Sequence, residues 1–343
     1  MKKIIALYLP QYHEFEENNK WWGNGFTEWT CVNNAKPRSE KHKILKPHPD
    51  IGQYSLLDAE VRRKQAVMAK KYGVYGFCYY HYWFGTKVLM DRTMQLMLVD
   101  GEPNLPFCLS WANEPWTRRM NGGTGELLQA NNYGDEQEWE SHLQYLLPFF
   151  RSPNYIKIDN KPVFVIYRLS QIPNCKQRLE YYRDRLKEFG FGGMFVVMTV
   201  GNFSDDFRSM CEYTDATFDF YPNFLWQTSM ISNVVDNVAF YDMNRVYERI
   251  MADQPVHHRH FKGTMVGFDS SPRSPLKCNV FLNGAPSLFK KNLDDILSLP
   301  EEFVFVNAWN EWGEGCALEP SEEFGYGYLE SIRKSVGAHS IKC

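Results

Sequence analysis

The 343-residue sequence has no Cys-x-x-Cys pair and no apolar run near the roughly 18 residues that a membrane-spanning helix needs. Its eight cysteines are scattered singly, and Cys78 and Cys108 lie inside apolar runs, where a free thiol packs as a small hydrophobic group. The apolar segment 4–9 is too short for a signal peptide, and polar residues follow it at once. These features predict reduced cysteines, a cytoplasmic protein and no membrane span.

Clusters of lysine and arginine are also missing, and the net charge is −3. Because nucleic-acid binding needs concentrated positive charge, we expect no nucleic-acid partner. The glycine-rich phosphate-binding motifs, the His-Glu-x-x-His zinc motif and the Gly-x-Ser-x-Gly nucleophile motif are absent. The Asp-x-Asp pair that holds the metal of many nucleotide-sugar transferases is absent as well. We therefore expect no cofactor and no metal ion.

Apolar, β-branched segments alternate with helix-like segments along the whole chain. The predicted strands are residues 4–9, 76–82, 106–111, 162–167, 194–200, 216–221, 263–268 and 303–308. Continuous apolar runs of this kind are typical of parallel strands that are covered on both faces. Between them, apolar residues at spacings of three and four predict helices. The predicted buried face of the first helix carries Leu57, Val61, Met68 and Tyr72.

Eight such β/α units without a break in composition predict one (β/α)8 barrel, a TIM barrel, that forms a single domain over residues 1–343. Its first βα loop is long and rich in aromatic residues, and we expect this loop to form a lid or a wall. An open doubly wound sheet is the alternative. That fold usually has a glycine-rich turn after its first strand, and here the turn reads Pro-Gln-Tyr-His.

The segment 303–315 changes abruptly from a buried strand into the sequence Asn-Ala-Trp-Asn-Glu-Trp-Gly-Glu-Gly. Glu311 and Glu314 are three residues apart on this turn, so both carboxylates can face one cleft at the barrel mouth. Their mutual repulsion in a partly dry site would raise the pKa of one of them, which gives an acid and a base. Paired carboxylates beside indole rings favour chemistry on glycosidic bonds. We predict Glu311 and Glu314 as catalytic residues; a solvated turn that caps the last helix is the alternative.

The other predicted strand ends supply aromatic, amide, carboxylate and imidazole side chains. Rings stack on the apolar face of a sugar and planar polar groups bind its hydroxyls, so the predicted partner is an oligosaccharide or polysaccharide. The predicted substrate-binding residues are Tyr12, Trp29, Tyr80, His81, Tyr82, Trp111, Asn113, Glu114, Trp116, Tyr221, Asp269, Trp309 and Asn310. Glu114 could instead be a helix-start carboxylate or a catalytic partner, and His81 could be a structural core residue. Arg168 and Arg273 also follow strands, and Glu319 is expected to be a solvated acid before the last helix.

Several of these stretches resemble a known family. Residues 310–315, NEWGEG, followed by Leu-Glu-Pro at 318–320, resemble the signature of the family 99-like glycoside hydrolase domain. Residues 8–13 (YLPQYH), 22–29 (WGNGFTEW), 75–84 (YGFCYYHYWF) and 111–116 (WANEPW) resemble its WbsX-type branch, which is often labelled a polysaccharide-biosynthesis glycosyltransferase. The resemblance spans nearly the whole chain. It implies a (β/α)8 barrel without a metal.

The resemblance also implies roles for the two glutamates. Glu314 would be the general acid/base, and Glu311 would engage the 2-hydroxyl of the sugar, which attacks C1 to form an anhydro-sugar with net retention. The comparable motif of family 99 endo-α-mannosidases has His where Gly313 stands, which leaves the substrate open.

The first hypothesis is thus a retaining glycoside hydrolase that acts on a mannose-like glycan. The alternatives are a glycosyltransferase in O-antigen or capsular polysaccharide synthesis and a non-catalytic carbohydrate-binding barrel. A cytoplasmic location favours the transferase, whereas the missing nucleotide-binding motifs count against it. The intact carboxylate pair counts against the simple binder. The sequence leaves the oligomeric state open.

Overall fold

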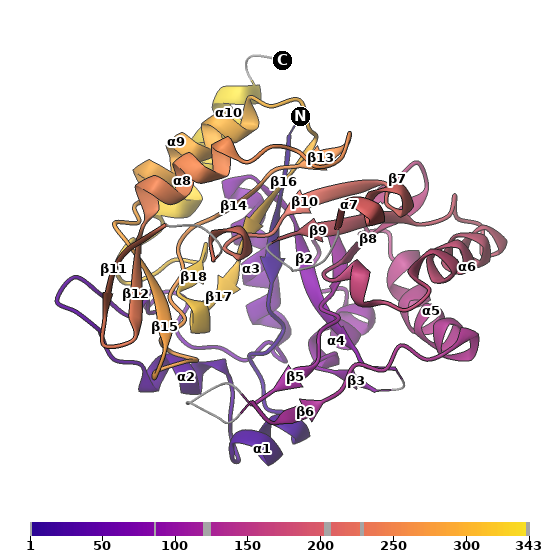
Figure 1. The fold of residues 1–343 in the computed structure, drawn as a ribbon, viewed down its shortest axis with the longest axis horizontal. Helices are drawn as coiled ribbons and strands as arrows, with labels where there is room; N and C mark the ends of the chain where they lie inside the picture. Colours follow the sequence, from indigo (N-terminus) through magenta and orange to yellow (C-terminus); the bar gives the residue numbers. More distant parts are fainter. Residues whose placement is uncertain (1, 86, 119–124, 202–206, 227–229, 341–343) are drawn as a thin grey trace.

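A computed structural model describes residues 2–85, 87–118, 125–201, 207–226 and 230–340 (Figure 1). All the strands expected from the sequence are present, with small differences at their ends. They are β1 (Lys3–Tyr8), β2 (Val74–Trp83), β4 (Phe107–Trp111), β8 (Lys161–Ile166), β9 (Phe195–Val200), β10 (Ala216–Asp219), β14 (Gly263–Met265) and β16 (Phe303–Asn307). Shorter strands are β3 (Val88–Leu89), β5 (Trp116–Thr117), β6 (Leu127–Gln129), β7 (Lys157–Ile158), β11 (Ile231–Val235), β12 (Val238–Asp242), β13 (His260–Phe261), β15 (Cys278–Leu282), β17 (Asn310–Glu311) and β18 (Cys316–Ala317).

The main sheet is a parallel barrel with a divided seventh strand. Its order is β13-β10-β9-β8-β4-β2-β1-β16-β14. Only Lys262 separates β13, which pairs with β10, from β14, which pairs with β16, so the two halves of this strand link the two ends of the sheet. At Gly263 a Cβ atom would lie 1.8 Å from the carbonyl oxygen of Asp219, so the close approach of the strands leaves no room for a side chain. The predicted (β/α)8 barrel is confirmed, and the open sheet was the wrong alternative.

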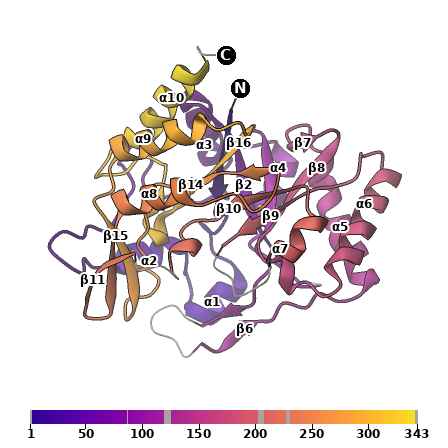
Figure 2. The same cartoon turned by 45° about the horizontal axis from the view of Figure 1, so that its top comes forward.

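Helices cover the outside of the barrel. They are α3 (Ala59–Tyr72), α4 (Arg92–Asp100), α5 (Glu136–Arg151), α6 (Cys175–Glu188), α7 (Phe207–Met210), α8 (Met243–Ala252), α9 (Pro286–Leu297) and α10 (Gly327–Ser340). In Figures 1 and 2, α8, α9 and α10 gather on one side of the strands, and α5 and α6 lie on the opposite side. No helix in the described ranges has the length and apolar character to cross a membrane.

The predicted face of the first of these helices, α3, was partly wrong. Leu57 precedes α3 and is 41% exposed, although Tyr72 is buried as expected. The buried face instead includes Arg62, whose Nη1 donates to the carbonyl oxygen of Leu56 at 2.6 Å and whose guanidinium pairs with Asp100. A cation can occupy this face because its donors find partners in the loop before α3 and at the C-terminal end of α4.

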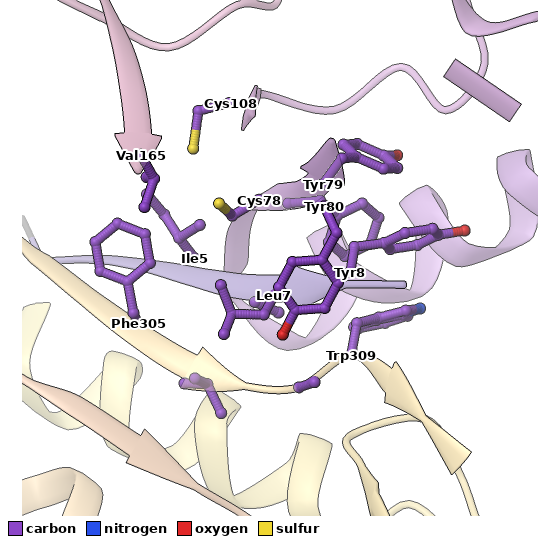
Figure 3. Packing of buried hydrophobic residues seen from close by; sticks show 14 of the residues in the cluster. Ile5, Leu7, Tyr8, Cys78, Tyr79, Tyr80, Cys108, Val165, Phe305 and Trp309 are labelled. Carbon is purple, nitrogen blue, oxygen red and sulfur yellow. The ribbon is translucent and has the colours of Figure 1, made fainter. Parts of the chain in front are cut away.

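Apolar side chains from adjacent strands pack closely inside the fold (Figure 3). Cys78 and Cys108 are register partners on β2 and β4, and both are free thiols with no exposed surface. Phe218 and Phe305 stack with their ring centroids 4.3 Å apart. This dense core gives the strand ends a rigid base, which a site built at those ends requires.

The loop after β1 is long and aromatic, as predicted, and it contains α1 (Glu16–Trp22) and α2 (Glu28–Asn34). Trp29 on α2 is buried against Tyr12 and Tyr54, with ring centroids 4.6 and 5.1 Å away, and it also contacts Trp312 at 6.0 Å. The loop therefore packs against the turn that follows β16. Glu28, the first residue of α2, is carried to the barrel mouth by this packing.

A buried carboxylate anchors the same turn. Glu319 is only 2% exposed, so the expectation of a solvated acid was wrong. Its Oε1 accepts hydrogen bonds from Gln65 Nε2 at 2.8 Å and Trp309 Nε1 at 3.1 Å. Its Oε2 accepts from the Tyr54 hydroxyl at 2.6 Å and Trp312 Nε1 at 2.9 Å. Burial outweighs these bonds and raises the pKa of Glu319 to about 7.

This geometry makes the carboxylate hard to replace. Each oxygen accepts from one indole N–H, so Glu319→Gln would point an NH2 group at one of the two tryptophans and leave a buried donor without an acceptor. We expect a loss of about 3 kcal/mol in the free energy of unfolding, measured by urea denaturation at pH 8, where the wild-type carboxyl is ionised. The exposed Glu322→Gln is the matched control. A variant as stable as this control would contradict the anchoring role.

Candidate active site

A cavity of about 600 Å³ opens at the C-terminal ends of the barrel strands. Six of the residues predicted from the sequence line it, namely Glu311, Glu314, Glu114, Trp116, Tyr80 and Tyr82. Other lining residues include Gln11, Trp22, Glu28, Tyr167, Arg168, Trp226, Phe268 and Arg273. The barrel thus brings together residues that are up to about 300 positions apart in the chain, as its topology requires.

The turn that carries Glu311 and Glu314 is a small hairpin. β17 pairs antiparallel with β18, and a single 3-10 turn, Trp312–Glu314, connects them. The backbone N–H of Asp269 donates to the carbonyl oxygen of Glu314 at 2.6 Å, and Gly315 closes the turn with a φ of 57°. Asn310 fixes the other end through two hydrogen bonds to the backbone of Leu9, at 2.8 and 3.0 Å. Both carboxylates are therefore held at the mouth of the barrel.

Arg273 connects three carboxylates in this mouth. Its Nη2 lies 2.8 Å from Glu311 Oε2, and its Nη1 lies 2.5 Å from Glu314 Oε1. Its Nε donates to both oxygens of Glu28 at 3.1 and 3.2 Å. The Glu28 side chain is 2% exposed and that of Glu311 is 6% exposed, whereas that of Glu314 is 28% exposed. Glu314 is thus the member of the cluster that solvent reaches most easily.

The two catalytic candidates differ in their surroundings. Burial raises the pKa of Glu311 to about 8; Arg273 opposes this shift, and the negative charges of Glu314 and Glu28 add to it. The expected repulsion between the carboxylates is present, but desolvation is the larger cause. At neutral pH Glu311 therefore retains a proton in the free protein. Two carboxyl groups in different environments beside one cavity can serve as a donor and an acceptor of protons.

A second charged pair lies in the cavity wall after β4 and β8. Arg168 Nη1 is 3.7 Å from Glu114 Oε2, and the Glu114 side chain is 46% exposed. Asn113 fixes Arg168 because its side chain accepts from the backbone N–H of Arg168 and donates to its carbonyl oxygen, both at 2.8 Å. Asn113 has no exposed surface, so it supports the wall from behind.

Aromatic side chains form two walls of the cavity. On the side of β2 and β4, Trp116 packs against Tyr82 and Trp21, with ring centroids 5.3 and 5.6 Å away. On the side of β10 and β14, Trp226 packs against Phe268 at 5.5 Å and is 37% exposed. Such accessible rings suit stacking with the apolar faces of sugars.

Several other residues predicted to bind substrate lie beneath the carboxylate turn. The hydroxyl of Tyr12 donates to the carbonyl oxygen of Asn310 and accepts from the backbone N–H of Trp312 at 3.1 Å. Trp29 packs under Trp312, and Trp309 donates to Glu319. In this structure Tyr12, Trp29, Trp309 and Asn310 do not line the cavity. Their contacts position Glu311 and Glu314 from below.

The remaining predicted residues are buried in the barrel wall. His81 Nε2 lies 2.9 Å from His142 Nε2, and burial lowers the pKa of His81 to about 3, so the imidazole is neutral. Trp111 donates to the carbonyl oxygen of Trp83 at 3.0 Å. The Tyr221 hydroxyl donates to Asp253 at 2.7 Å, and Asp269 lies 2.8 Å from the Nε2 of His42. His81, Trp111, Tyr221 and Asp269 do not line the cavity.

Glu28 and Arg273, which pair with each other, are among the cavity residues that were not predicted from the sequence as catalytic or substrate-binding. A Cβ atom at Gly313 would lie 2.0 Å from Glu28 Oε2 and 3.0 Å from Arg273 Nε, so both side chains occupy space that a glycine leaves open. The departure from the family 99 motif at Gly313 was the available signal. A glycine at this position leaves space for a neighbouring side chain, although the sequence alone does not identify that side chain.

Comparison with known proteins gives a family for the chain. The family described as Glycosyltransferase WbsX matches residues 4–332. The WxcX protein of Xanthomonas campestris pv. campestris (strain B100) is 32% identical over 348 residues, which cover 97% of this chain and 49% of that protein. The chain therefore spans about half the length of the curated relatives that it matches.

Solved structures share the barrel. The GH99 endo-alpha-mannosidase from Bacteroides thetaiotaomicron superposes with a TM-score of 0.57 and 15% identity, covering 98% of this chain and 97% of that one. A structure described as a glycoside hydrolase-like protein gives a TM-score of 0.63 and 14% identity, with 97% and 93% coverage. At these identities the likeness concerns the fold, and the assignment to a family comes from the match over residues 4–332. The chain belongs to the WbsX glycosyltransferase family, in agreement with the resemblance that its motifs carry.

Proposed function

We propose that this chain is a glycan-active enzyme, and that it works as a retaining glycoside hydrolase on a mannose-like glycan with a free 2-hydroxyl. The observation that carries the proposal is the pair Glu311 and Glu314, which share one guanidinium at the mouth of a cavity with aromatic walls. Membership of the WbsX family and the shared barrel of the GH99 endo-alpha-mannosidase support a glycan as the substrate.

In the proposed reaction both carboxyl groups move protons. Glu314 protonates the leaving oxygen as its bond to C1 breaks, and Glu311 accepts the proton of the 2-hydroxyl as O2 bonds to C1. Water then opens this anhydro-sugar at C1 from the opposite side, giving its proton to Glu314 while O2 recovers its proton from Glu311. Two inversions give net retention, and both groups return to their starting states.

The charge of the free site fits this scheme. The reaction starts with one proton on the pair, and the raised pKa of Glu311 provides one proton at neutral pH. In the free protein this proton lies on Glu311, whereas the reaction needs it on Glu314. Because the two groups are coupled, a sugar hydroxyl that donates to Glu311 favours the transfer of the proton to Glu314.

The aromatic walls and the second charged pair would hold the sugar. We assign stacking to Trp116, Tyr82 and Trp226, and hydroxyl binding to Glu114 and Arg168. The partner is then an oligosaccharide or polysaccharide. The cavity volume of about 600 Å³ allows more than one sugar unit.

A glycosyltransferase is the second candidate, favoured by the description of the family. A nucleotide-sugar donor would bring a doubly charged pyrophosphate to a wall that contains Glu28, Glu114, Glu311 and Glu314. Among the residues that the structure describes, the basic side chains in this wall are Arg168 and Arg273, and each already faces carboxylates. The charge distribution therefore counts against such a donor.

The acid/base role is tested by Glu314→Gln. We expect at least a 100-fold loss of turnover on labelled mannose oligosaccharides, because a general acid contributes about that much or more. Calorimetric binding of the same oligosaccharides should change little, since the amide keeps the shape of the carboxyl. The surface variant Glu322→Gln serves as the control. Unchanged turnover would reject the assignment, and binding without turnover in the wild type would favour a carbohydrate-binding barrel.

Thermal shifts separate the hydrolase from the transferase. A ligand that binds only the folded state raises the melting temperature according to its concentration and affinity. We expect mannose oligosaccharides to raise the melting temperature of this chain, and GDP- and UDP-sugars to leave it unchanged. The opposite pattern would support the transferase.

The pH dependence follows from Glu311. Its pKa of about 8 means that the pair keeps its proton below this pH and loses it as the pH rises through 8. We expect kcat/KM to fall on the alkaline side with a midpoint near pH 8, as measured with a neutral oligosaccharide substrate. A profile that stays flat up to pH 10 would contradict a proton held at this site.

A further inference from the structure

Glu28 and Arg273 are the charged residues of the cluster to which the proposed reaction gives no role. Glu28 comes from α2 in the first loop, and Arg273 comes from the segment between β14 and β15. Besides the bonds from Nε, Arg273 Nη2 lies 3.1 Å from Glu28 Oε2. The guanidinium thus uses one edge for Glu28 and its remaining N–H groups for Glu311 and Glu314.

This arrangement fixes the orientation of the guanidinium. An arginine that contacts two carboxylates with its Nη atoms can still rotate about its side-chain bonds, and a third contact at Nε removes that freedom. Glu28 can make the contact because Gly313 has no side chain in its path. Burial raises the pKa of Glu28, and the ion pair with Arg273 opposes this shift. Without Arg273 the ionised form of Glu28 would lose its only ion-pair partner among the residues that the structure describes.

Other groups around the pair come from several elements, and their charges must be considered too. Besides Arg273, Glu28 and Glu314, the titratable side chains in the described part of the chain that interact with Glu311 are Tyr12 after β1, Tyr80 and Tyr82 on β2, and Cys316 on β18. Burial raises the pKa of each of them, so they are neutral around pH 8. Among the residues that the structure describes, Arg273, Glu28 and Glu314 are therefore the charged groups that act most strongly on Glu311.

We propose that Glu28 and Arg273 are positioning residues which together set the charge of the Glu311–Glu314 pair, with Glu28 holding the guanidinium in the space that Gly313 leaves open. This inference rests on the proposed function for its catalytic meaning. The electrostatic part of the inference concerns the free protein and can be measured without turnover.

The two residues act on the pair in opposite directions. The positive charge of Arg273 favours ionised carboxylates, so its removal makes the pair hold its proton to higher pH. The negative charge of Glu28 has the reverse effect, so its removal makes the pair release its proton at lower pH. If Glu28 and Arg273 only supported the fold, neutralising each of them in turn would not shift the titration midpoint of the pair in opposite directions.

The test is a 13C NMR titration of the full chain labelled at the glutamate side-chain carboxyl carbon, with the Glu311 signal assigned by its loss in Glu311→Gln. Arg273→Met should move the midpoint of this signal upward by about one pH unit or more. Glu28→Gln should move it downward. The exposed first-loop variant Glu16→Gln is the matched control and should leave it in place.

Arg273→Lys provides a second variant in case Arg273→Met does not fold, because it keeps one positive charge but loses the three-way contact. It should give an upward shift smaller than that of Arg273→Met. Shifts of the same sign in Glu28→Gln and the Arg273 variants, or no shift in either, would overturn the proposal.

The same variants are then assayed on oligosaccharides. The pH at which kcat/KM falls on the alkaline side should shift in the same direction as the NMR midpoint of each variant. In the Arg273 variants, the decrease in kcat should be larger than the increase in KM. Opposite NMR shifts in a protein without activity on any glycan would leave the positioning role intact and reject the proposed function. Activity that does not follow the NMR midpoints would reject the catalytic meaning of Glu28 and Arg273.

Discussion

The cost of removing carboxylates from water is the constraint on which the barrel mouth depends. Glu28, Glu311 and Glu319 are all nearly excluded from solvent within one small region, and Glu314 stands at its edge. An ionised carboxylate in such a place must receive hydrogen bonds, face a cation or take up a proton. Three parts of the structure meet that requirement: the packing of the first loop, the hairpin after β16 and the segment with Arg273.

The three buried carboxyl groups are stabilised in different ways. Glu319 accepts from four neutral donors, and two of these are Trp309 and Trp312, which flank Asn310 and Glu311, so these bonds also fix the backbone there. Glu28 faces a guanidinium. Glu311 shares that guanidinium and, with its pKa near 8, also retains a proton. Glu319 and Glu311 can both change their charge near neutral pH, but of the two it is Glu311 that lines the cavity, where chemistry on a glycosidic bond would require such a group.

Local pattern in the sequence was sufficient for the barrel and for the place of its carboxylate pair. Apolar β-branched runs located the strands, and the abrupt change after residue 308 located Glu311 and Glu314, because both signals lie within a few consecutive residues. The burial of Arg62 and Glu319 could not be read in this way, since their partners Asp100, Tyr54 and Gln65 are distant in sequence. For the same reason, residues such as His81 and Trp111 follow the pattern of site residues yet lie behind the wall. A strand end brings a side chain near the mouth, but only packing decides whether it faces the cavity.

Gly313 has a consequence for how this site can diverge among relatives. A side chain at this position would overlap with Glu28 and crowd Arg273, so a mutation that adds one disrupts an ion-paired cluster in a single step. Loss of Arg273 alone leaves buried carboxylates without their cation, and loss of Glu28 alone removes one of the three carboxylates that Arg273 contacts. Replacement of Gly313 by histidine thus requires coordinated substitutions of Glu28 and Arg273. The three residues lie on three separate segments of the chain.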